Sequence, residues 1–478
     1  MKNTRIYKLL RSLDRKILNR FLKFVNSPYF NVNKDIITLT TLVSSHIKNN
    51  NSEQIADKQS IWKDVLSMDE AYNDLKFRKL CNDILEKFER FLTVEQLEKR
   101  NLMQVNLLLA SIKEHKFDML IDKQKKKSYR YLDRALEQSS DYFLQKYFFH
   151  RNLQGLTSNY DKKVAKQYPF SKEFYDNLST NLEAFYIIEK LRHATDVLTW
   201  RKLYTIDYEV DVSEIRKRIV TSGIQDVPAV QIYELMYLLM ADKADAGDYE
   251  TLKSYADKEI DNFAKNEQRE ILDAMLSYVI RDINKGDKTA LHEVLELYDW
   301  GIEKDIILEN GFLSPTTFRN YVIGGLRISE FKKVETFISE NAKLLKDSQR
   351  ENAVNFCLAR VAFHLKRYED VLVYLNKVNY DDIWYNVNAR YYTLASYYEL
   401  DEDDALASAL ASFLAFLRRE KSIDSGRKIK QVSFAKYLSK LTTSKHSKAK
   451  LLKLQDAIKE DNKVFNKSWL LEKLSDLI

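Results

Sequence analysis

Histidine and acidic side chains are the residues of this sequence that could hold a metal ion, but their spacing matches no known site. The string nearest to a zinc protease motif is His292-Glu293-Val294-Leu295-Glu296, which lacks the second histidine. No histidine has a glutamate three residues before it, as di-iron helical bundles require. The acidic runs at 381–382 and 401–404 lack the glycine and distal glutamate of an EF-hand. We expect no metal, and interpret both runs as helix N-terminal caps.

Motifs for cofactors and for nucleophilic catalysis are also missing. No glycine precedes a lysine, so there is no P-loop, and the only adjacent glycines are Gly324-Gly325, so there is no dinucleotide fingerprint. A Gly-x-Ser-x-Gly elbow is absent. We therefore expect a protein that is not an enzyme and has no cofactor. An all-helical enzyme with a site that no motif reveals stays an alternative.

The two cysteines, Cys81 and Cys357, are 276 positions apart and belong to no Cys-x-x-Cys pair. A disulfide or zinc framework is not indicated. Free cysteine is among the most buried residue types, so we expect two reduced thiols in helix cores.

Basic side chains are concentrated near the two ends of the chain. Residues 1–30 carry eight basic side chains against one acidic, residues 226–310 carry 20 acidic against 9 basic, and residues 417–450 carry 11 basic against 2 acidic. Basic ends can attract nucleic acid, anionic lipid, an acidic protein or the acidic middle of another copy, although such runs are usually solvated helix faces. The N-terminal candidates for a basic patch are Lys8, Arg11, Arg15 and Lys23.

The elements that carry these residues must be helices. Only 9 Gly and 4 Pro occur among 478 residues, about 3% against an average near 12%. Sandwiches, barrels and doubly wound sheets use Gly and Pro at their turns, so those folds are close to excluded. The sequence is 45% hydrophobic and 31% charged, which fits long amphipathic helices. We predict an all-α protein.

Apolar periodicity and cap residues place the first helices. One helix is predicted over 5–25, because Pro28 disfavours helical geometry at the preceding residue. Asn33 can cap a second helix that runs to about Lys48. The stretch 203–212 is predicted to be an extended connector. Further helices are expected at about 73–100, 102–114, 117–138, 140–154, 171–200 and 229–245.

The C-terminal half contains a repeat of turns followed by apolar positions. The turns read Gly247-Asp248-Tyr249, Gly286-Asp287-Lys288, Ser329-Glu330-Phe331, Lys366-Arg367-Tyr368 and Glu402-Asp403-Asp404, with successive starts 39, 43, 37 and 36 residues apart. Two apolar or small positions follow each turn. The first is Leu252, Leu291, Val334, Val371 and Ala407, and the second is Ala256, Leu295, Ile338, Leu375 and Ala411.

These positions resemble the packing residues of tetratricopeptide repeats (TPR). The small, aromatic and aliphatic positions are matched by Ala359, Tyr368, Val371, Leu375 and Val378, and again by Ala395, Tyr398, Ala407 and Leu414. The resemblance covers about residues 230–420, and the Trp and terminal Pro of each repeat are lacking. Separately, 27–31 and 72–75 resemble parts of large uncharacterised bacterial helical proteins, which brings no function with it.

The resemblance implies an α-solenoid of helical hairpins with a concave surface formed by the first helix of each pair. An irregular helical N-terminal region would precede it. The expected segments are a basic region 1–100, a helical array 101–228, TPR-like repeats 229–420 and a basic cap 421–478. The last two repeats would present their concave side through Phe356, Arg360, His364, Tyr392, Ser396 and Glu399.

Aromatic and arginine side chains suit the anchoring of a peptide or protein partner. The favoured function is therefore a non-catalytic protein–protein interaction scaffold. A nucleic-acid-associated or regulatory protein that uses its basic N- and C-terminal helices is the runner-up, although base-reading motifs are absent. The N-terminus shows no signal-peptide core, and the longest weakly apolar stretch, 405–417, is too short to span a bilayer. We expect a cytoplasmic protein without a transmembrane segment.

Overall fold

The computed structural model describes residues 1–49, 57–66, 71–134, 139–157, 172–204, 207–287, 289–380 and 382–478. These residues form α-helices with a few short 3₁₀ and π turns and contain no β-strand; one isolated antiparallel bridge pairs Glu309 with Phe312. The all-α prediction is confirmed. Within the described ranges, no helix combines the length and the apolar character that crossing a membrane requires.

The described chain divides into two compact units. One comprises Met1–Lys190 with Ser213–Val230, and the other comprises Leu191–Val212 with Gln231–Ile478. Two of the three boundaries fall inside helices, α10 (Lys172–Leu203) and α12 (Pro228–Met240), so each of these contributes residues to both units. The finer division into four segments stays a prediction.

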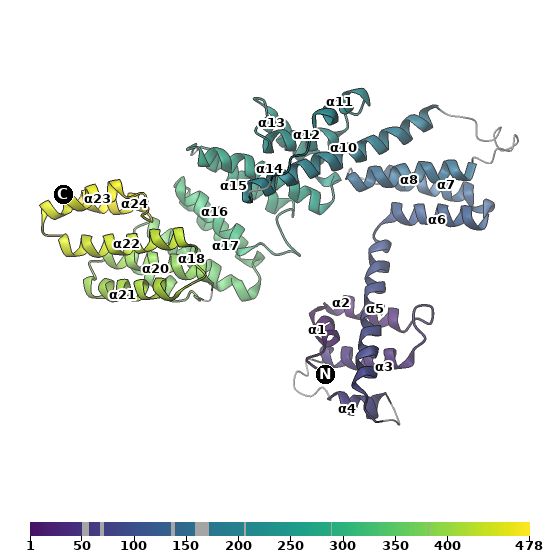
Figure 1. The fold of residues 1–478 in the computed structure, drawn as a ribbon, viewed down its shortest axis with the longest axis horizontal. Coiled ribbons are helices and arrows are strands. Elements are labelled where there is room, and N and C mark those ends of the chain that lie inside the picture. Colours follow the sequence, from purple (N-terminus) through teal and green to yellow (C-terminus); the bar gives the residue numbers. More distant parts are fainter. Residues whose placement is uncertain are drawn as a thin grey trace. The chain divides into compact units, whose positions relative to one another are not determined.

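The N-terminal helices of the first unit pack around one long helix (Figure 1). Phe21, Phe88 and Phe91 lie at the centre of this core, with the Phe21 ring centroid 5.0 Å from that of Phe88 and 5.5 Å from that of Phe91. Asn33 and Asn73 cap the helices that follow them, as the sequence predicts for Asn33. The helices are α1 (Arg5–Ser12), α2 (Arg15–Val25), α3 (Lys34–Lys48), α4 (Lys58–Ser60) and α5 (Asp74–Glu98).

The prediction of a single helix over 5–25 is wrong, because the helix is interrupted at Leu13. Leu13 is extended, with φ −82° and ψ 144°, and Asp14 is the N-cap of α2. The Asp14 carboxylate accepts a hydrogen bond of 2.8 Å from the Ile17 backbone N–H. A short acidic side chain that satisfies free N–H groups in this way favours a new helix start over a continuous helix.

The rest of the first unit is also helical. Its second core contains Val105, Leu109, Leu132, Phe149 and Leu153. The helix predicted over 117–138 begins later than expected, because Lys116 is left-handed (φ 55°) and residues 118–120 form a 3₁₀ turn. Of the predicted connector, residues 207–212 have no regular structure, and residues 205–206 lie outside the described chain. The helices are α6 (Asn101–His115), α7 (Ile121–Arg134), α8 (Ser140–Thr157) and α11 (Ser213–Thr221).

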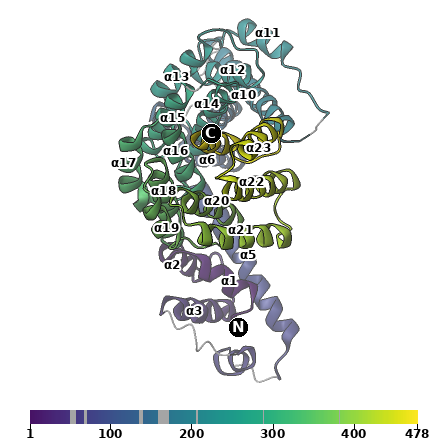
Figure 2. The ribbon, with the colours of Figure 1, turned by 90° about the vertical axis from the view of Figure 1, so that its left-hand side faces the viewer.

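In the second unit, successive helices pack on one another in chain order (Figures 1 and 2). In addition, α16 packs on α18, and α18 packs on α20. The helices are α13 (Asp248–Glu259), α14 (Lys265–Asn284), α15 (Ala290–Glu303), α16 (Pro315–Arg327), α17 (Phe331–Asn341), α18 (Asp347–His364), α19 (Tyr368–Leu375), α20 (Ile383–Glu399), α21 (Asp403–Arg419), α22 (Ser425–Ser444), α23 (Lys448–Glu460) and α24 (Lys467–Leu477).

Five of the inter-helix turns share one backbone feature, a residue in the left-handed region just before the next helix. These residues are Gly247, Gly286, Ser329, Lys366 and Asp401, with φ between 55° and 107°. The fifth residue after each is buried, and so is the ninth. They are Leu252 and Ala256, Leu291 and Leu295, Val334 and Ile338, Val371 and Leu375, and Leu406 and Leu410.

The predicted phase of the last turn is therefore wrong by one residue. A turn that starts at Glu402, as predicted from the sequence, would place Ala407 and Ala411 in the core. Both of these alanines are exposed, whereas Leu406 and Leu410 are buried. The left-handed residue at this turn is Asp401, and a one-residue shift on a helix rotates a side chain by about 100°.

The basic segment 421–478 shares its hydrophobic core with the helices that precede it. One continuous cluster of buried side chains extends from Phe356 to Leu474. In α24, the Trp469 ring lies 5.5 Å from the Tyr398 ring of α20 and 6.1 Å from the Phe434 ring of α22. The apolar side of α24 is thus packed against α20 and α22.

Candidate functional site

The second unit brings two arginines and three aromatic rings together, a group that we name the arginine–aromatic face. It consists of Arg319 on α16, Arg360 on α18, and Trp384, Tyr385 and Tyr392 on α20. The Arg319 guanidinium carbon lies 4.1 Å from the centre of the Trp384 ring and 4.8 Å from that of Tyr385. The Arg360 guanidinium carbon lies 5.5 Å from the centre of the Tyr392 ring. These distances are within the range of cation–π attraction.

Helix geometry and one buried ring explain why the aromatic side chains lie together. Tyr385 and Tyr392 are seven residues apart on α20, close to two helical turns, so they lie on the same side. Phe356 of α18 supports both, with ring centroids 5.2 Å from Tyr385 and 6.2 Å from Tyr392. It also lies 5.2 Å from Trp384. The result is a rigid aromatic layer on which the two guanidinium groups rest.

The charges of this face are not neutralised inside the described chain. Neither Arg319 nor Arg360 forms an ion pair with a carboxylate of the described residues, and both side chains are half-buried. The Nε atom of Arg360 is buried and has no hydrogen-bond partner there. Burial raises the pKa of the Tyr385 hydroxyl, an effect that Arg319 opposes. An arginine with unused donors can bind a carboxylate through a pair of parallel hydrogen bonds.

Three of the six residues predicted to line a concave surface are not available to a partner. Phe356 and Ser396 have no exposed area and Tyr392 is only 8% exposed. Their placement on an open face is corrected, because α18 packs directly on α20 and the aromatic rings interlock between them. Phe356 and Tyr392 act as the support of the arginine–aromatic face.

The other three predicted residues, Arg360, His364 and Glu399, differ from one another in their surroundings and in their availability to a partner. Arg360 belongs to the arginine–aromatic face. His364 is exposed at the end of α18, and partial desolvation, with the charge of Arg360 added, lowers its pKa. Glu399 is not free, because its carboxylate lies 3.0 Å from the Lys473 amine of α24, and both side chains are largely buried. Burial tends to lower the pKa of Lys473, but its contacts with Glu399, and further contacts with Asp476 and Glu472, outweigh this effect and raise it.

Sequence reasoning missed Arg319, Trp384 and Tyr385. Arg319 could have been found by its distance from the next left-handed turn. It lies ten residues before Ser329, and the predicted site residue Phe356 likewise lies ten residues before Lys366. Aligning the helices on those turns extends the candidate site to α16. The contacts with Trp384 and Tyr385 depend on packing between helices and have no counterpart in the local sequence.

The predicted basic patch lies on the surface of the first unit. Lys8 and Arg11 on α1, and Arg15 and Lys23 on α2, are all exposed. None of the four pairs with an acidic side chain of the described residues, while Arg15 donates a hydrogen bond of 3.5 Å to the Lys48 carbonyl oxygen. The patch therefore keeps its positive charge toward solvent.

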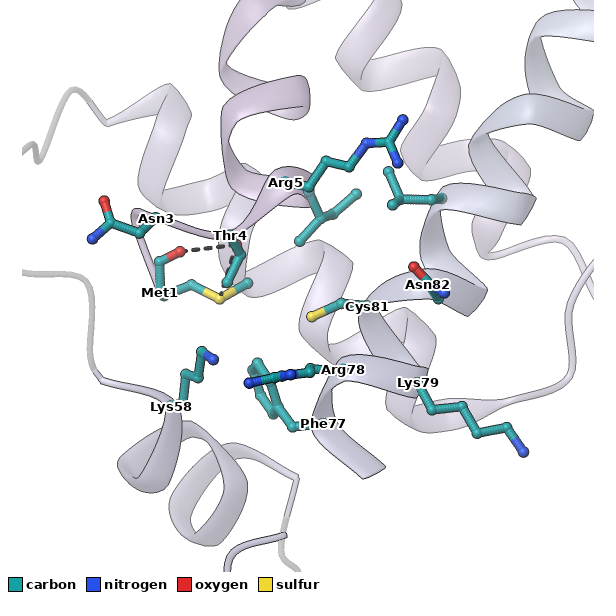
Figure 3. Close-up of a pocket in the computed structure, with 12 residues that line it drawn as sticks. Met1, Asn3, Thr4, Arg5, Lys58, Phe77, Arg78, Lys79, Cys81 and Asn82 are labelled. Carbon is teal, nitrogen blue, oxygen red and sulfur yellow. Dashed lines mark hydrogen bonds between the residues drawn. The ribbon is translucent and has the colours of Figure 1, made fainter. Parts of the chain in front are cut away.

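A pocket of about 450 Å³ opens in the same unit, among α1, α4 and α5 (Figure 3). Arg5, Lys58, Arg78 and Lys79 belong to its lining, with the Lys79 amine directed away from the cavity (Figure 3). The Asp74 carboxylate lies 3.1 Å from Lys58 and 2.6 Å from Arg78, so a single acid offsets them. The pocket carries net positive charge and suits an anion.

Cys81 also lines this pocket, and its sulfur points into it (Figure 3). Burial raises the pKa of the Cys81 thiol to about 11, so it stays protonated at neutral pH and is a poor nucleophile. Cys357 is a buried free thiol in α18. The described residues contain no group of three or more His, Cys, Asp or Glu side chains placed to hold a metal ion.

Comparison with known proteins adds no relative. No protein-family model, curated protein or solved structure matches the chain.

Proposed function

We propose that this protein is a non-catalytic scaffold and that its arginine–aromatic face binds an acidic segment of a protein partner. In this proposal, residues 229–420, which run from α12 to α21, form a TPR-like α-solenoid of helical hairpins, and α22–α24 cap it. The recurring left-handed turns, the two buried positions that follow each turn, and the packing of α16, α18 and α20 side by side support that architecture. The first helices of such hairpins present one continuous surface.

One observation carries the proposal. Arg319 and Arg360 are both stacked on aromatic rings of α20, and neither has a carboxylate partner among the described residues. Stacking restricts the motion of each guanidinium group, so little further order is lost when a ligand binds. A carboxylate from outside would use the free donors and restore charge balance. A partner with two acidic side chains would engage both arginines at once.

A peptide-display selection tests this proposal. Random peptides are selected on the wild-type protein, and enriched peptides are then measured by fluorescence anisotropy. We expect enrichment of acidic peptides that also contain an apolar residue. Replacement of both Arg319 and Arg360 by Gln should weaken their binding by roughly a hundredfold or more, since each lost charged hydrogen-bond pair costs about 1.5–3 kcal/mol.

Arg327→Gln is the matched control, because Arg327 is an exposed arginine on the same helix as Arg319. Its affinity for the enriched peptides should equal that of the wild type. Circular dichroism establishes that each variant is folded. Enrichment of neutral or basic peptides, or equal binding by the double variant and the wild type, would contradict the proposal.

The basic patch of the first unit favours a second candidate function, association with a phosphate polymer such as nucleic acid. The four unpaired basic side chains on α1 and α2 support it. We expect DNA or RNA binding that decreases steeply with salt, and a smaller salt slope when Lys8 and Arg11 are replaced by Gln. Absence of binding at low salt removes this function and leaves the peptide-binding proposal intact.

A further inference from the structure

A second recess involves α20 on the side away from the arginine–aromatic face. Arg390 lies two residues before Tyr392, so the two side chains leave α20 in nearly opposite directions. The recess has a volume of about 440 Å³. Its polar lining consists of Tyr380, Arg390, Thr393, Tyr397, Ser408 and Ser412, from α20, α21 and the residues before α20.

Arg390 is fixed in this recess by neutral partners. Its Nε donates a hydrogen bond of 2.7 Å to the Asn386 side-chain oxygen, and its Nη1 donates one of 3.2 Å to the Ser412 hydroxyl. The guanidinium carbon lies 4.8 Å from the centre of the Phe416 ring. A guanidinium group has five N–H donors, so three remain without a partner among the described residues.

No carboxylate of the described chain balances this charge. Arg390 forms no ion pair there. Burial lowers the pKa of Arg390; Tyr380 acts in the opposite direction, and the cation of Arg419 adds to the lowering. Arginine nevertheless stays protonated in proteins. A half-buried, immobilised cation with a second cation nearby is a site of positive potential that an anion would stabilise.

The existing hydrogen bonds of the recess determine which of its hydroxyl groups can donate to such an anion. Thr393 already donates to the Ala389 carbonyl oxygen at 3.0 Å, and Tyr380 donates to the Leu375 carbonyl oxygen at 3.2 Å. Ser412 accepts from Arg390, so its own hydrogen is free. Tyr397 and Ser408 have no side-chain hydrogen bond in the described chain. Three hydroxyls and one guanidinium group thus surround the same space.

We propose that this recess binds the phosphate group of a small organic phosphate monoester. Phosphates and carboxylates are both oxyanions that accept hydrogen bonds, so a carboxylate could bind some of the donors in this recess. Phosphate is preferred because it offers three acceptor oxygens to the guanidinium group and the three hydroxyls, whereas a carboxylate offers two. The volume exceeds that of one ion, so the rings of Tyr380 and Tyr397 would contact the organic part.

Calorimetric titration of the full-length protein with phenyl phosphate, inorganic phosphate and benzoate tests this site. We expect one phenyl phosphate per chain, weaker inorganic phosphate and weakest benzoate. Ser412→Asp places a carboxylate beside Arg390 as an internal competitor. This variant should lose phenyl phosphate binding without a decrease in melting temperature, because it pairs the cation instead of removing it.

Ser412→Asn is the neutral control of equal size and should weaken phenyl phosphate binding far less than Ser412→Asp does, because its amide group can still hydrogen-bond both Arg390 and the phosphate. Arg390→Lys should weaken phenyl phosphate roughly tenfold by loss of the planar fork. The variant with Gln at Arg319 and Arg360 should bind phenyl phosphate normally, which separates this site from the peptide-binding face. No binding to wild type, equal binding by Ser412→Asp, or tighter binding of benzoate would overturn the proposal.

Discussion

Two valines on one short helix provide a test of single side-chain burial. Val371 of α19 has no exposed area, whereas Val373, two residues later on the same helix, is 57% exposed. Val371→Asp should decrease the free energy of unfolding by about 3 kcal/mol or more, because it buries a charge without a partner. Val373→Asp should change it by less than about 1 kcal/mol. Urea denaturation followed by tryptophan fluorescence measures both, and equal effects would contradict the orientation of α19.

His150 predicts a pH dependence of stability. It is buried in α8 beside Phe149 and Phe174, and burial, with the charge of Lys146 added, lowers its pKa to about 4. The unfolded chain binds a proton near pH 6.5, and the folded protein does so only near pH 4. The contribution of neutral His150 is therefore fully present above pH 6.5 and is lost as pH decreases from about 6.5 to 4.

His150→Gln removes this titration. The variant should lose about 3 kcal/mol less stability than the wild type between pH 7 and pH 4, since each unit of pKa shift corresponds to about 1.4 kcal/mol. Urea unfolding at a series of pH values measures the difference. Parallel pH profiles of the two proteins would show that burial of His150 does not shift its pKa in this way.

At the scale of elements, the N-cap at Asp14 separates α1 from α2. Its carboxylate bonds to the Ile17 N–H, and Asp14 itself is exposed, so little packing is lost on truncation. Asp14→Ala should cost about 1 kcal/mol, and Asp14→Ser should cost much less, because serine is also a good cap. Thermal unfolding compares the two. A variant Asp14→Ala as stable as the wild type would show that the cap does not define the helix start.

The register of α21 provides a second test at this scale. Leu410 is buried and Ala411 is exposed, which reverses the assignment made from sequence spacing. Leu410→Ala should destabilise the protein by about 2–5 kcal/mol, since it leaves a cavity. Ala411→Leu should be nearly neutral, because its side chain enters solvent. If Ala411→Leu destabilises the protein by overpacking, Ala411 faces the core, as the sequence spacing predicted, and the orientation of α21 described above is contradicted.

At the scale of the whole chain, the last helix is held to α20 by an ion pair that closes a long loop. Glu399 and Lys473 are separated by 74 positions, and their side chains are only 14% and 10% exposed. Lys473→Ala should therefore cost about 2 kcal/mol or more, because it leaves a partly buried carboxylate without its closest cation. The double variant Glu399→Gln/Lys473→Met should recover most of this loss.

Hydrogen exchange of the α24 backbone amides distinguishes local from global effects of these variants. We expect Lys473→Ala to increase exchange in α24 more than in α18, since only α24 loses a contact directly. If the single and double variants exchange equally fast, the ion pair does not hold α24 in place.

Interactions between residues close together in the sequence were sufficient to predict the all-α class and many of the helix ends. The scarcity of Gly and Pro and the apolar periodicity need no knowledge of distant contacts, and the cap at Asn33 acts on backbone groups two and three residues away. Burial at Val371 and Leu375 also followed from spacing within one helix. These features depend on neighbours along the chain, so they could be predicted.

The residues that form the proposed binding surface are set by contacts between helices, which the linear order of the sequence does not contain. Phe356 and Ser396 were predicted to be open and are covered, because the packing of α18 on α20 leaves no space above them. Glu399 is paired with a lysine 74 positions away, and the Arg319 guanidinium group lies on two aromatic rings of α20 that follow it by 65 and 66 positions. Exposure and charge pairing are properties of the packed assembly, so only the tertiary structure could decide them.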